Sequence, residues 1–436
     1  MSVGLQRLRE DAPALREGAI AKGEDPEAVD RAVELDVRRR ALLGEADALR
    51  AERNTASREI GAAIQRGAPP DGEEVAALKA SSSRAAEGLG RLEVELGAAQ
   101  AELDDLLLRI PNPPDPDVPV GGEGDSRIVR AWGDPAPHRR PGGNAVRPHW
   151  EVGAKLGLLD LEAGAKVTGS GFPLYRGAGA ALQRALIDFM VGLHVREHGM
   201  TEIWPPALIN AASARGTGQI PDKEDLMYVV PRDDLYLVPT AEVPVTNIHR
   251  DEIIEADRLP IRYVAYSPCF RREAGAAGRE TRGILRVHQF DKVEMVCFER
   301  PADSSTTLEW LTARAEVVLQ RLGLPYRVKL MATGDMGFVQ AKKYDLEAWA
   351  PGVEQWLEVS SISNFRDYQA RRMNIRWRPE RGARPEILHT LNGSGLALAR
   401  TVAAILEVHQ QPDGSVIVPE PLRAVLGTDC LSRPEA

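Results

Sequence analysis

A repeating spacing of apolar residues between positions 75 and 110 constrains the fold of this chain more than any other feature. Apolar or small residues recur there at alternating intervals of three and four, which is the spacing of a coiled-coil seam. The positions are Val75, Leu78, Ser82, Ala85, Leu89, Leu92, Leu96, Ala99, Leu103, Leu106 and Ile110. An upstream seam runs through Leu35, Leu42, Ala46, Leu49, Ala56, Ile60 and Ala63.

Residues 65 to 74, QRGAPPDGEE, separate the two seams and contain the Gly and Pro residues that end helices. Two such helices are predicted to fold back as an antiparallel hairpin about 50 Å long, at a rise of about 1.5 Å per residue. The spacing alone favours a dimerisation or spacer element, whereas arginines on the first helix favour a surface that faces phosphate. The candidate RNA contacts are Arg39, Arg50, Arg53, Arg58 and Arg66.

The segment from 110 to 122, IPNPPDPDVPVGG, marks a domain boundary because its five prolines exclude both helix and central strand. A chain of 436 residues also exceeds what one hydrophobic core usually supports. We therefore predict an N-terminal domain over 1–110, a linker over 111–122 and a second domain over 123–436.

The second domain combines strands with helices. A helix is predicted from about 180 to 198, and a last helix from about 395 to 409 with only a short tail after it. Alternating apolar runs between them, such as 261–270 and 292–298, are typical of antiparallel strands, since some connecting loops are too short for parallel crossovers.

Composition bears on three classes of protein: nucleic-acid-coating proteins, zinc proteins and membrane or secreted proteins. The net charge of −9 argues against wholesale coating of nucleic acid and restricts any RNA contact to one region. Three widely spaced cysteines without a CxxC pair indicate reduced thiols and no zinc site. Because no apolar run approaches a membrane span and the start is too charged for a secretory signal, a cytoplasmic location without membrane association is expected.

Residues 267 to 295 contain an unusual concentration of arginine, with Arg279 and Arg282 in a glycine-rich stretch between two strands. Arginine presents a planar fork that matches carboxylate or phosphate oxygens. A solvated basic loop would explain any two of these arginines, but it explains poorly why Arg271 and Glu273 share a face at a strand edge. An anion-binding hairpin is therefore predicted.

Gly393 and Gly395 precede an apolar helix that carries Arg400 in its first turns. Glycines allow close approach to a ligand, and a helix N-terminus offers free N–H groups to negative charge. A tight strand-to-helix turn explains the two glycines equally well, so both interpretations remain open.

Three segments resemble, in order, the motifs of class II aminoacyl-tRNA synthetases: HGMTEIWPPALIN at 198–210, FRRE at 270–273 and GSGLALAR at 393–400. Others resemble the bacterial-type seryl-tRNA synthetase family, nearly end to end. They are PTAEVPVTNIHRDEI, SPCFRREAG, VHQFDKVEMV, EVSSISNFRDYQARRMNIR and HTLNGSGLA. The resemblance implies an α+β fold: a class II antiparallel sheet flanked by helices, with an N-terminal coiled-coil hairpin that binds tRNA.

The resemblance also implies the reaction and its partners. A member of this family is a serine–tRNA ligase, which activates L-serine with ATP to seryl-adenylate and transfers the seryl group to the 3′-terminal adenosine of tRNA(Ser). Charging of tRNA(Sec) is left open. Mg²⁺ is the implied metal, and the expected assembly is a homodimer with motif 1 at its interface.

Residue roles are likewise implied by the resemblance. The catalytic residues are Arg271, Arg400 and Glu358. Serine is bound by Thr240, Ala241, Glu242, Arg271, Glu294, Asn392 and Ser394. ATP is bound by Arg271, Arg272, Glu273, Arg286, Val287, Phe290, Glu358, Val359, Ser360, Ser361 and Arg400, and Mg²⁺ by Glu358 and Ser361.

Two rival interpretations follow from other uses of the same fold. A ligase that aminoacylates a carrier protein would lack a long tRNA-binding hairpin, which this chain has. A non-catalytic paralogue would have lost Arg271, Glu273, Glu358 or Arg400, and all four are present.

Overall fold

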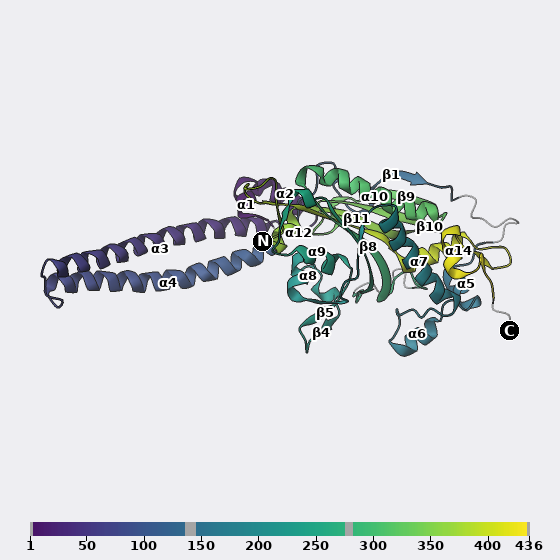
Figure 1. Ribbon diagram of the computed structural model, residues 1–436, viewed down its shortest axis with the longest axis horizontal. Helices are drawn as coiled ribbons and strands as arrows, with labels where there is room; N and C mark the ends of the chain where they lie inside the picture. The colour runs from purple at the N-terminus through teal and green to yellow at the C-terminus, as the bar shows by residue number, and fades with distance from the viewer. Residues whose placement is uncertain (1–2, 136–144, 275–281, 434–436) are drawn as a thin grey trace. The chain divides into compact units, whose positions relative to one another are not determined.

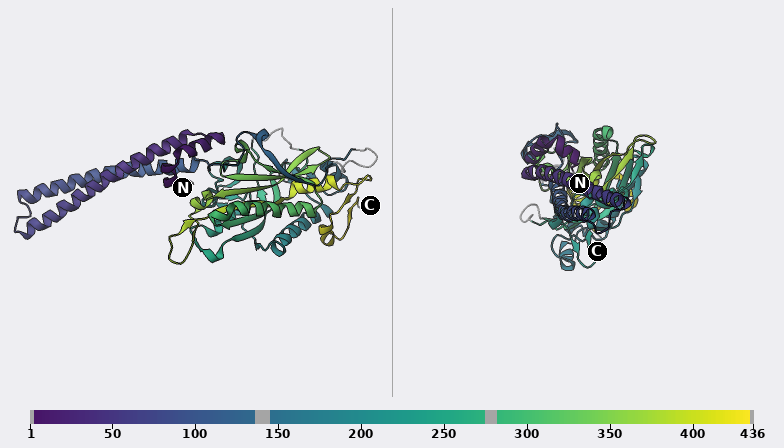
Figure 2. Two further views of the ribbon diagram at one scale, coloured as in Figure 1. Left: turned by 90° about the horizontal axis from the view of Figure 1, so that it is seen from above. Right: turned by 90° about the vertical axis from the view of Figure 1, so that its left-hand side faces the viewer.

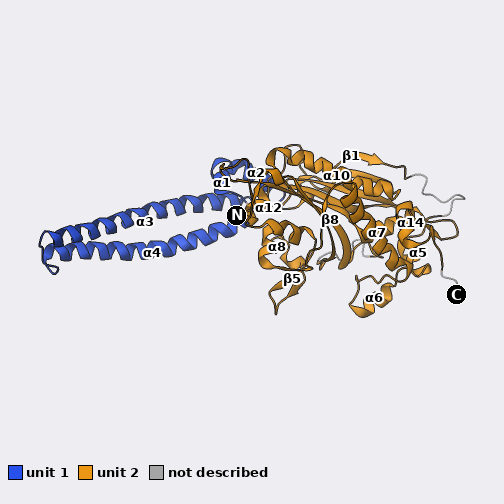
Figure 3. Cartoon of the chain, viewed as in Figure 1, with its two compact units in different colours: residues 1–111 blue, residues 112–436 orange. Residues whose placement is uncertain are grey.

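The computed structural model describes residues 3–135, 145–274 and 282–433, so Arg279 lies outside the described residues. The chain separates into two compact units, Met1–Pro111 and Asn112–Ala436 (Figure 3). The exact domain boundaries, with a linker over 111–122, stay a prediction. Within the second unit, the proline-rich segment is anchored by Asn112, whose side-chain amide donates to the carbonyl oxygens of Val339 (3.0 Å) and Phe365 (2.8 Å).

The first unit is a helical hairpin with two short helices at its base. Its helices are α1 (Leu5–Glu10), α2 (Ala12–Ala21), α3 (Glu27–Gln65) and α4 (Glu73–Arg109). Helices α3 and α4 lie side by side and antiparallel in both views (Figures 1 and 2). All the seam positions predicted on α4 and α3 are buried or half-buried. The predicted coiled-coil hairpin is therefore confirmed.

The base of the hairpin has its own small core, in which Leu8 and Leu15 pack with Leu35 and Leu103. Beside it, the buried carboxylate of Asp36 accepts two hydrogen bonds from Arg9, at 2.7 and 2.8 Å. The hydrogen bond from Arg9 lowers the pKa of Asp36. The carboxylate is thus held charged where α1 meets α3.

The second unit is built on one large sheet, which within the described ranges has eight strands. Their order is β1 (Arg127–Trp132), β9 (Tyr326–Leu330), β10 (Lys342–Ala350), β11 (Gln355–Arg366), β14 (His389–Ala397), β8 (Gln289–Glu299), β7 (Ile261–Phe270) and β2 (Thr201–Ile203). Every neighbouring pair is antiparallel except β2 and β7. The predicted α+β fold with an antiparallel sheet is confirmed.

Helices cover this sheet and bury its apolar side chains. The longer ones are α7 (Ala178–Arg196), α10 (Ser304–Arg321) and α13 (Leu398–Val408). Helix α7 contacts β7 and β8, α10 contacts β11 and β14, and α13 contacts β10 and β11. Leu182, Leu186 and Met190 on α7 are fully buried in the main core, as the predicted helix from 180 to 198 requires.

Shorter elements complete the unit. The helices are α5 (His149–Lys155), α6 (Leu161–Val167), α8 (Ala211–Thr217), α9 (Glu242–Thr246), α11 (Thr333–Met336), α12 (Tyr368–Met373) and α14 (Glu420–Leu426). The 3₁₀ turns are η1 (Glu123–Asp125), η3 (Glu224–Leu226), η4 (Asn247–His249), η5 (Ala256–Arg258) and η6 (Pro301–Asp303). Small sheets pair β3 (Leu208–Asn210), β5 (Leu235–Leu237) and β4 (Val229–Val230); β13 (Glu386–Ile387), β12 (Arg376–Arg378) and β6 (Ile253–Glu255); and β15 (Val416–Ile417) with β16 (Cys430–Leu431).

The predicted last helix from 395 to 409 begins too early. Residues 389–397 form β14, so α13 starts only at Leu398, and α14 follows it where only a tail was predicted. Gly393 and Gly395 lie within this central strand. A Cβ at Gly393 would meet the Ile362 side chain at 3.0 Å, and one at Gly395 would meet the His194 ring at 2.7 Å. The two glycines thus make room for packing side chains.

Within the part of the chain that the structure describes, no helix is both long enough and apolar enough to cross a membrane.

Candidate active site

A cavity of about 450 Å³ opens on the large sheet and is lined by most of the side chains predicted from the sequence. Strands β8, β11 and β14 supply part of its wall, together with residues that follow β7 and residues at the start of α13. The predicted residues on its lining are Thr240, Glu242, Arg271, Glu273, Arg286, Val287, Phe290, Glu358, Val359, Ser360, Ser361, Asn392, Ser394 and Arg400.

Three predicted residues are not on this lining. Ala241 is fully buried in a small apolar core. Arg272 donates a hydrogen bond to the carbonyl oxygen of Asp225 at 2.9 Å. Glu294 is fully buried and lies behind Asn392 and Ser394.

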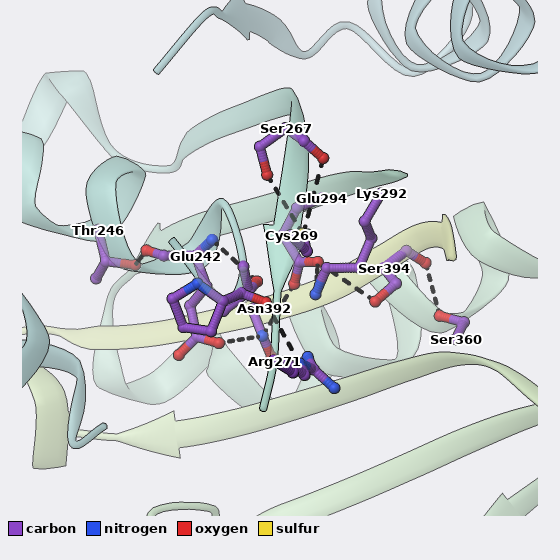
Figure 4. Close-up of polar contacts among 12 residues, drawn as sticks. Glu242, Thr246, Ser267, Cys269, Arg271, Lys292, Glu294, Ser360, Asn392 and Ser394 are labelled. Atoms are coloured by element: carbon purple, nitrogen blue, oxygen red, sulfur yellow. Dashed lines mark hydrogen bonds and ion pairs between the residues drawn. The ribbon is translucent and has the colours of Figure 1, made fainter. Parts of the chain in front are cut away.

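One end of the cavity gathers two carboxylates around a single amide (Figure 4). The side-chain nitrogen of Asn392 donates to Glu242 at 2.8 Å and to Glu294 at 3.0 Å. The amide oxygen of Asn392 is buried and has no hydrogen-bond partner among the described residues. This end therefore offers a free acceptor beside two acidic groups.

The two carboxylates differ in how they are neutralised. Glu294 contacts the Lys292 ammonium at 2.5 Å and accepts a hydrogen bond from the Ser394 hydroxyl at 3.3 Å. Glu242 has no contact of that kind with a cation within 4 Å in the described residues. Burial, followed by repulsion from Glu294, raises the pKa of Glu242 to about 7. A ligand cation beside Glu242 would offset these effects and stabilise its charged form.

A second pair of polar residues fixes the other oxygen of Glu242. The fully buried Gln369, on α12, donates to Glu242 at 2.7 Å. Thr390, on β14, donates in turn to the Gln369 side-chain oxygen at 2.8 Å. Because both Glu242 oxygens are held by amide donors, the carboxylate faces the cavity in one orientation.

The cavity lining also carries three arginines, Arg271, Arg286 and Arg400, and the part that they line is called the arginine end. The Arg271 guanidinium carbon lies 5.2 Å from the centre of the Phe290 ring, where it makes a cation–π contact. Arg286 donates to Glu273 at 2.6 Å, while its Nε is buried and unpartnered among the described residues. Free donor capacity on arginine is what a phosphate or carboxylate ligand would use.

Arg400 connects β11 with the segment that precedes β8. It donates to the backbone carbonyl oxygens of Glu358 (2.8 Å) and Leu285 (3.0 Å). The Glu358 side chain is itself 45% exposed. Desolvation alone would raise the pKa of Glu358, but Lys343, Arg400 and other cations outweigh it, so the pKa is lowered. Glu358 is thus an ionised, accessible carboxylate.

Several lining residues were missed by the sequence analysis. Lys223, Lys292, Asp335 and Lys343 all line the cavity. Lys292 could have been found, because it lies two positions before Glu294 and alternate residues of a strand share a face. Lys343 could not, since its place depends on the pairing of β10 with β11.

Of the arginines predicted to contact RNA, Arg39, Arg50, Arg53 and Arg58 lie on α3 and Arg66 directly follows it, all in the first unit. Three of them make ion pairs within that unit: Arg39 with Asp36, Arg50 with Glu93 and Arg66 with Glu74. Arg58 is exposed and donates to the backbone oxygen of Asn54, and Arg53 is half-buried. The exposed ion pairs of Arg50 and Arg66 are weak enough to exchange for phosphate, whereas Arg39 pairs with the buried Asp36.

Two models of protein families match the chain. The model described as tRNA synthetase class II core domain (G, H, P, S and T) matches residues 228–409. The model described as Seryl-tRNA synthetase N-terminal domain matches residues 4–114. Together they cover the candidate site and the helical hairpin.

Individual relatives are similar over nearly the whole chain. Serine–tRNA ligase from Gemmatimonas aurantiaca is 49% identical over 431 residues, which are 98% of this chain and 99% of the relative. The protein of that name from Thermomicrobium roseum is 52% identical over 97% of this chain and 93% of the relative. The crystal structure of seryl-tRNA synthetase from Pyrococcus horikoshii complexed with ATP has 38% identity and a TM-score of 0.93, over 99% of this chain and 100% of that one.

Proposed function

The chain belongs to the seryl-tRNA synthetases, and on that premise we propose how its cavity performs the reaction. It is a serine–tRNA ligase: ATP activates L-serine to seryl-adenylate, and the seryl group is then transferred to tRNA(Ser). The observation that carries the proposed roles is a single cavity lined both by Glu242 with Asn392 and by the arginines Arg271, Arg286 and Arg400. Serine has an ammonium for the first group, and ATP has phosphates for the second.

At the carboxylate end, we propose that Glu242 and Thr240 bind the serine ammonium. The support is the raised pKa of Glu242, which a bound cation would lower again. Asn392 and Ser394 take the serine hydroxyl, and Glu294 behind them holds both in place. A site built to hydrogen-bond a hydroxyl rejects alanine because its own polar groups would be left unpaired.

At the arginine end, Arg271 holds the α-phosphate and the serine carboxylate, while Arg286 and Arg400 take the γ-phosphate. Phe290 and Arg400 enclose the adenine, and Glu273 with the Val287 backbone reads its edge. A serine carboxylate oxygen attacks the α-phosphorus, and pyrophosphate leaves. This chemistry needs positioning and charge neutralisation more than a general base, which fits a cavity rich in guanidinium groups.

We propose that Glu358 and Ser361 bind Mg²⁺. The donor set fits this ion, since Glu358 is an ionised and accessible carboxylate and Mg²⁺ is usually held by one or two carboxylates together with substrate phosphates. When bound, the ion would neutralise phosphate charge. Ser360 and Val359 line the same wall of the cavity.

Recognition of tRNA is assigned to the hairpin and to the five arginines predicted on α3 and directly after it. The matching N-terminal family model and the exposed arginines support this assignment. We further propose that the enzyme works in the cytoplasm as a homodimer. Whether tRNA(Sec) is charged as well is a matter for direct assay with both transcripts.

Trapping of the adenylate with hydroxylamine, one amino acid at a time, tests the proposed function. We expect hydroxamate from serine at least about 100-fold faster than from alanine, followed by charging of a tRNA(Ser) transcript. Equal hydroxamate from alanine would contradict the proposed hydroxyl contacts. Serine-dependent consumption of ATP without transfer to tRNA would instead favour a carrier-protein ligase.

A further inference from the structure

A buried histidine and a buried glutamate form a connected pair outside the cavity lining. His149 begins α5 and Glu407 lies in the last turn of α13; both side chains are fully buried. One Glu407 oxygen accepts from the His149 ring nitrogen Nδ1 (2.8 Å) and from its backbone N–H (2.9 Å). The other accepts from the backbone N–H groups of Gly352 and Val353. Glu407 is therefore fully engaged as an acceptor.

This arrangement leaves the far nitrogen of the His149 ring as an acceptor. Since Nδ1 faces a carboxylate, it carries the proton, and Nε2 presents its lone pair. That lone pair accepts the backbone N–H of Ile284 at 3.2 Å. Ile284 is two residues before Arg286, so the pair acts on the backbone that leads into the arginine end of the cavity.

The neighbouring backbone is fitted closely to His149. Gly283 has φ +69°, and a Cβ there would lie 2.2 Å from His149 Nε2. The Arg282 guanidinium carbon lies 5.1 Å from the centre of the Trp150 ring. On the cavity side, Leu285 gives its carbonyl oxygen to Arg400. Residues 282–285 are thus held by α5 on one flank and by α13 on the other.

We propose that His149, oriented by Glu407, is a positioning residue for ATP binding. It fixes the Ile284 amide, and thereby the backbone from which Arg286 reaches the cavity. Because Glu407 and Arg400 both belong to α13, one helix sets the two arginines proposed for the γ-phosphate. The inference rests on the proposed role of Arg286.

Two matched variants separate the two hydrogen bonds of the His149 ring. In His149→Gln the amide oxygen reaches the place of Nε2 and keeps an acceptor for Ile284. In His149→Asn the amide nitrogen replaces Nδ1 and keeps the donor to Glu407, but the acceptor is lost. In serine-dependent ATP–pyrophosphate exchange, the KM for ATP of His149→Asn should be about tenfold higher than that of the wild type, and its KM for serine should be unchanged. His149→Gln should restore the KM for ATP to about wild type.

His249→Asn is the control, since His249 is also a buried histidine with Nδ1 against a carboxylate, that of Glu252. It should lower the thermal midpoint without changing the KM for ATP. Equal ATP KM values for His149→Asn and His149→Gln would overturn the inference, whatever their thermal midpoints. Arg286→Ala separates the proposed role of Arg286 from that of His149. If Arg286→Ala leaves the KM for ATP unchanged, the proposed role of Arg286 fails. If Arg286→Ala raises that KM and His149→Asn does not, only the inference about His149 fails.

Discussion

Arg271 is the residue proposed to contact both reactants of the activation step, ATP and serine. It lies on the cavity lining directly after β7 and contacts the Phe290 ring. Its proposed partners are the α-phosphate and the serine carboxylate, so its charge is needed most when the two react. Arg271→Ala should reduce adenylate formation by about 100-fold or more, measured by ATP–pyrophosphate exchange.

A control for charge alone is available in the same unit. Arg258 is about half exposed and pairs with Glu252, away from the cavity lining. Arg258→Ala should retain activity within about twofold, because exposed ion pairs contribute little. Near-normal exchange by Arg271→Ala would remove Arg271 from the mechanism.

Glu242 makes serine binding sensitive to pH. Burial and the nearby Glu294 raise its pKa to about 7. Below that pH the carboxyl is protonated and has no charge for the serine ammonium, whereas above it the carboxylate is present. The KM for serine should therefore rise about fivefold as the pH falls from 7 to 6, and it should level off above about pH 8. Exchange assays at saturating ATP across this range measure it.

The same ionisation predicts proton release. A bound ammonium lowers the pKa of Glu242, so serine binding near pH 7 should release part of a proton, which calorimetry in two buffers of different ionisation enthalpy detects. Glu242→Gln should bind serine weakly at every pH and release none. If the KM for serine of the wild type is flat between about pH 6 and pH 8, Glu242 does not meet the ammonium.

At the residue scale, the cavity residues that could be predicted are those that belong to recognisable motifs. Arg271, Glu358 and Arg400 could be placed together through motif resemblance, and all three line the cavity. Gln369 and His149 could not be predicted as supports. Each acts through a partner distant in the chain, and a buried polar side chain gives no periodic signal of its own.

At the scale of elements, regularity decides what can be predicted. The hairpin follows from a repeat sustained over many turns, and its seam is buried as expected. The start of α13 was misjudged because β14, buried between β11 and β8, has the sequence HTLNGSGLA, which lacks the apolar–polar alternation that marks a strand and runs directly into the apolar residues of α13. The central position of β14 depends on its pairing with strands that are distant in the sequence, so the local sequence does not show it.

The hairpin should be separable from catalysis. Residues 36–104 comprise most of α3 and α4 and the turn between them, in a unit with its own core. Deleting them, with the ends joined by a short glycine linker, should leave serine-dependent ATP–pyrophosphate exchange within about threefold of wild type. Charging of tRNA(Ser) should be lost, because the arginines proposed to contact phosphate are removed.

A milder variant checks the reason for that loss. Charge reversal of the exposed Arg58 should weaken tRNA binding, and more strongly at low salt than at high salt. The Arg58 variant should activate serine at the same rate as the wild type. Equal loss of activation and charging in the deletion would show that the hairpin is not a separate RNA-binding element.

At the scale of the whole molecule, the edge of the large sheet at β2 is a feature that one chain leaves unexplained. Strand β2 ends the sheet at Ile203, and the next residue, Trp204, is 77% exposed. Its ring contacts Tyr266 edge-on at 5.5 Å between ring centres. An uncovered strand edge beside an exposed indole is costly for a monomer and typical of a subunit interface.

The proposed homodimer can be tested at this edge. Light scattering after size exclusion should give wild-type protein twice the chain mass of 47.6 kDa, and Trp204→Asp should give the mass of one chain, because a carboxylate cannot be buried unpaired in an apolar interface. Val94 on α4 is the matched control, since it is 74% exposed but lies in the other unit. Val94→Asp should remain dimeric. A dimer that persists in Trp204→Asp would place the interface elsewhere, and a monomeric wild type would refute the dimer itself.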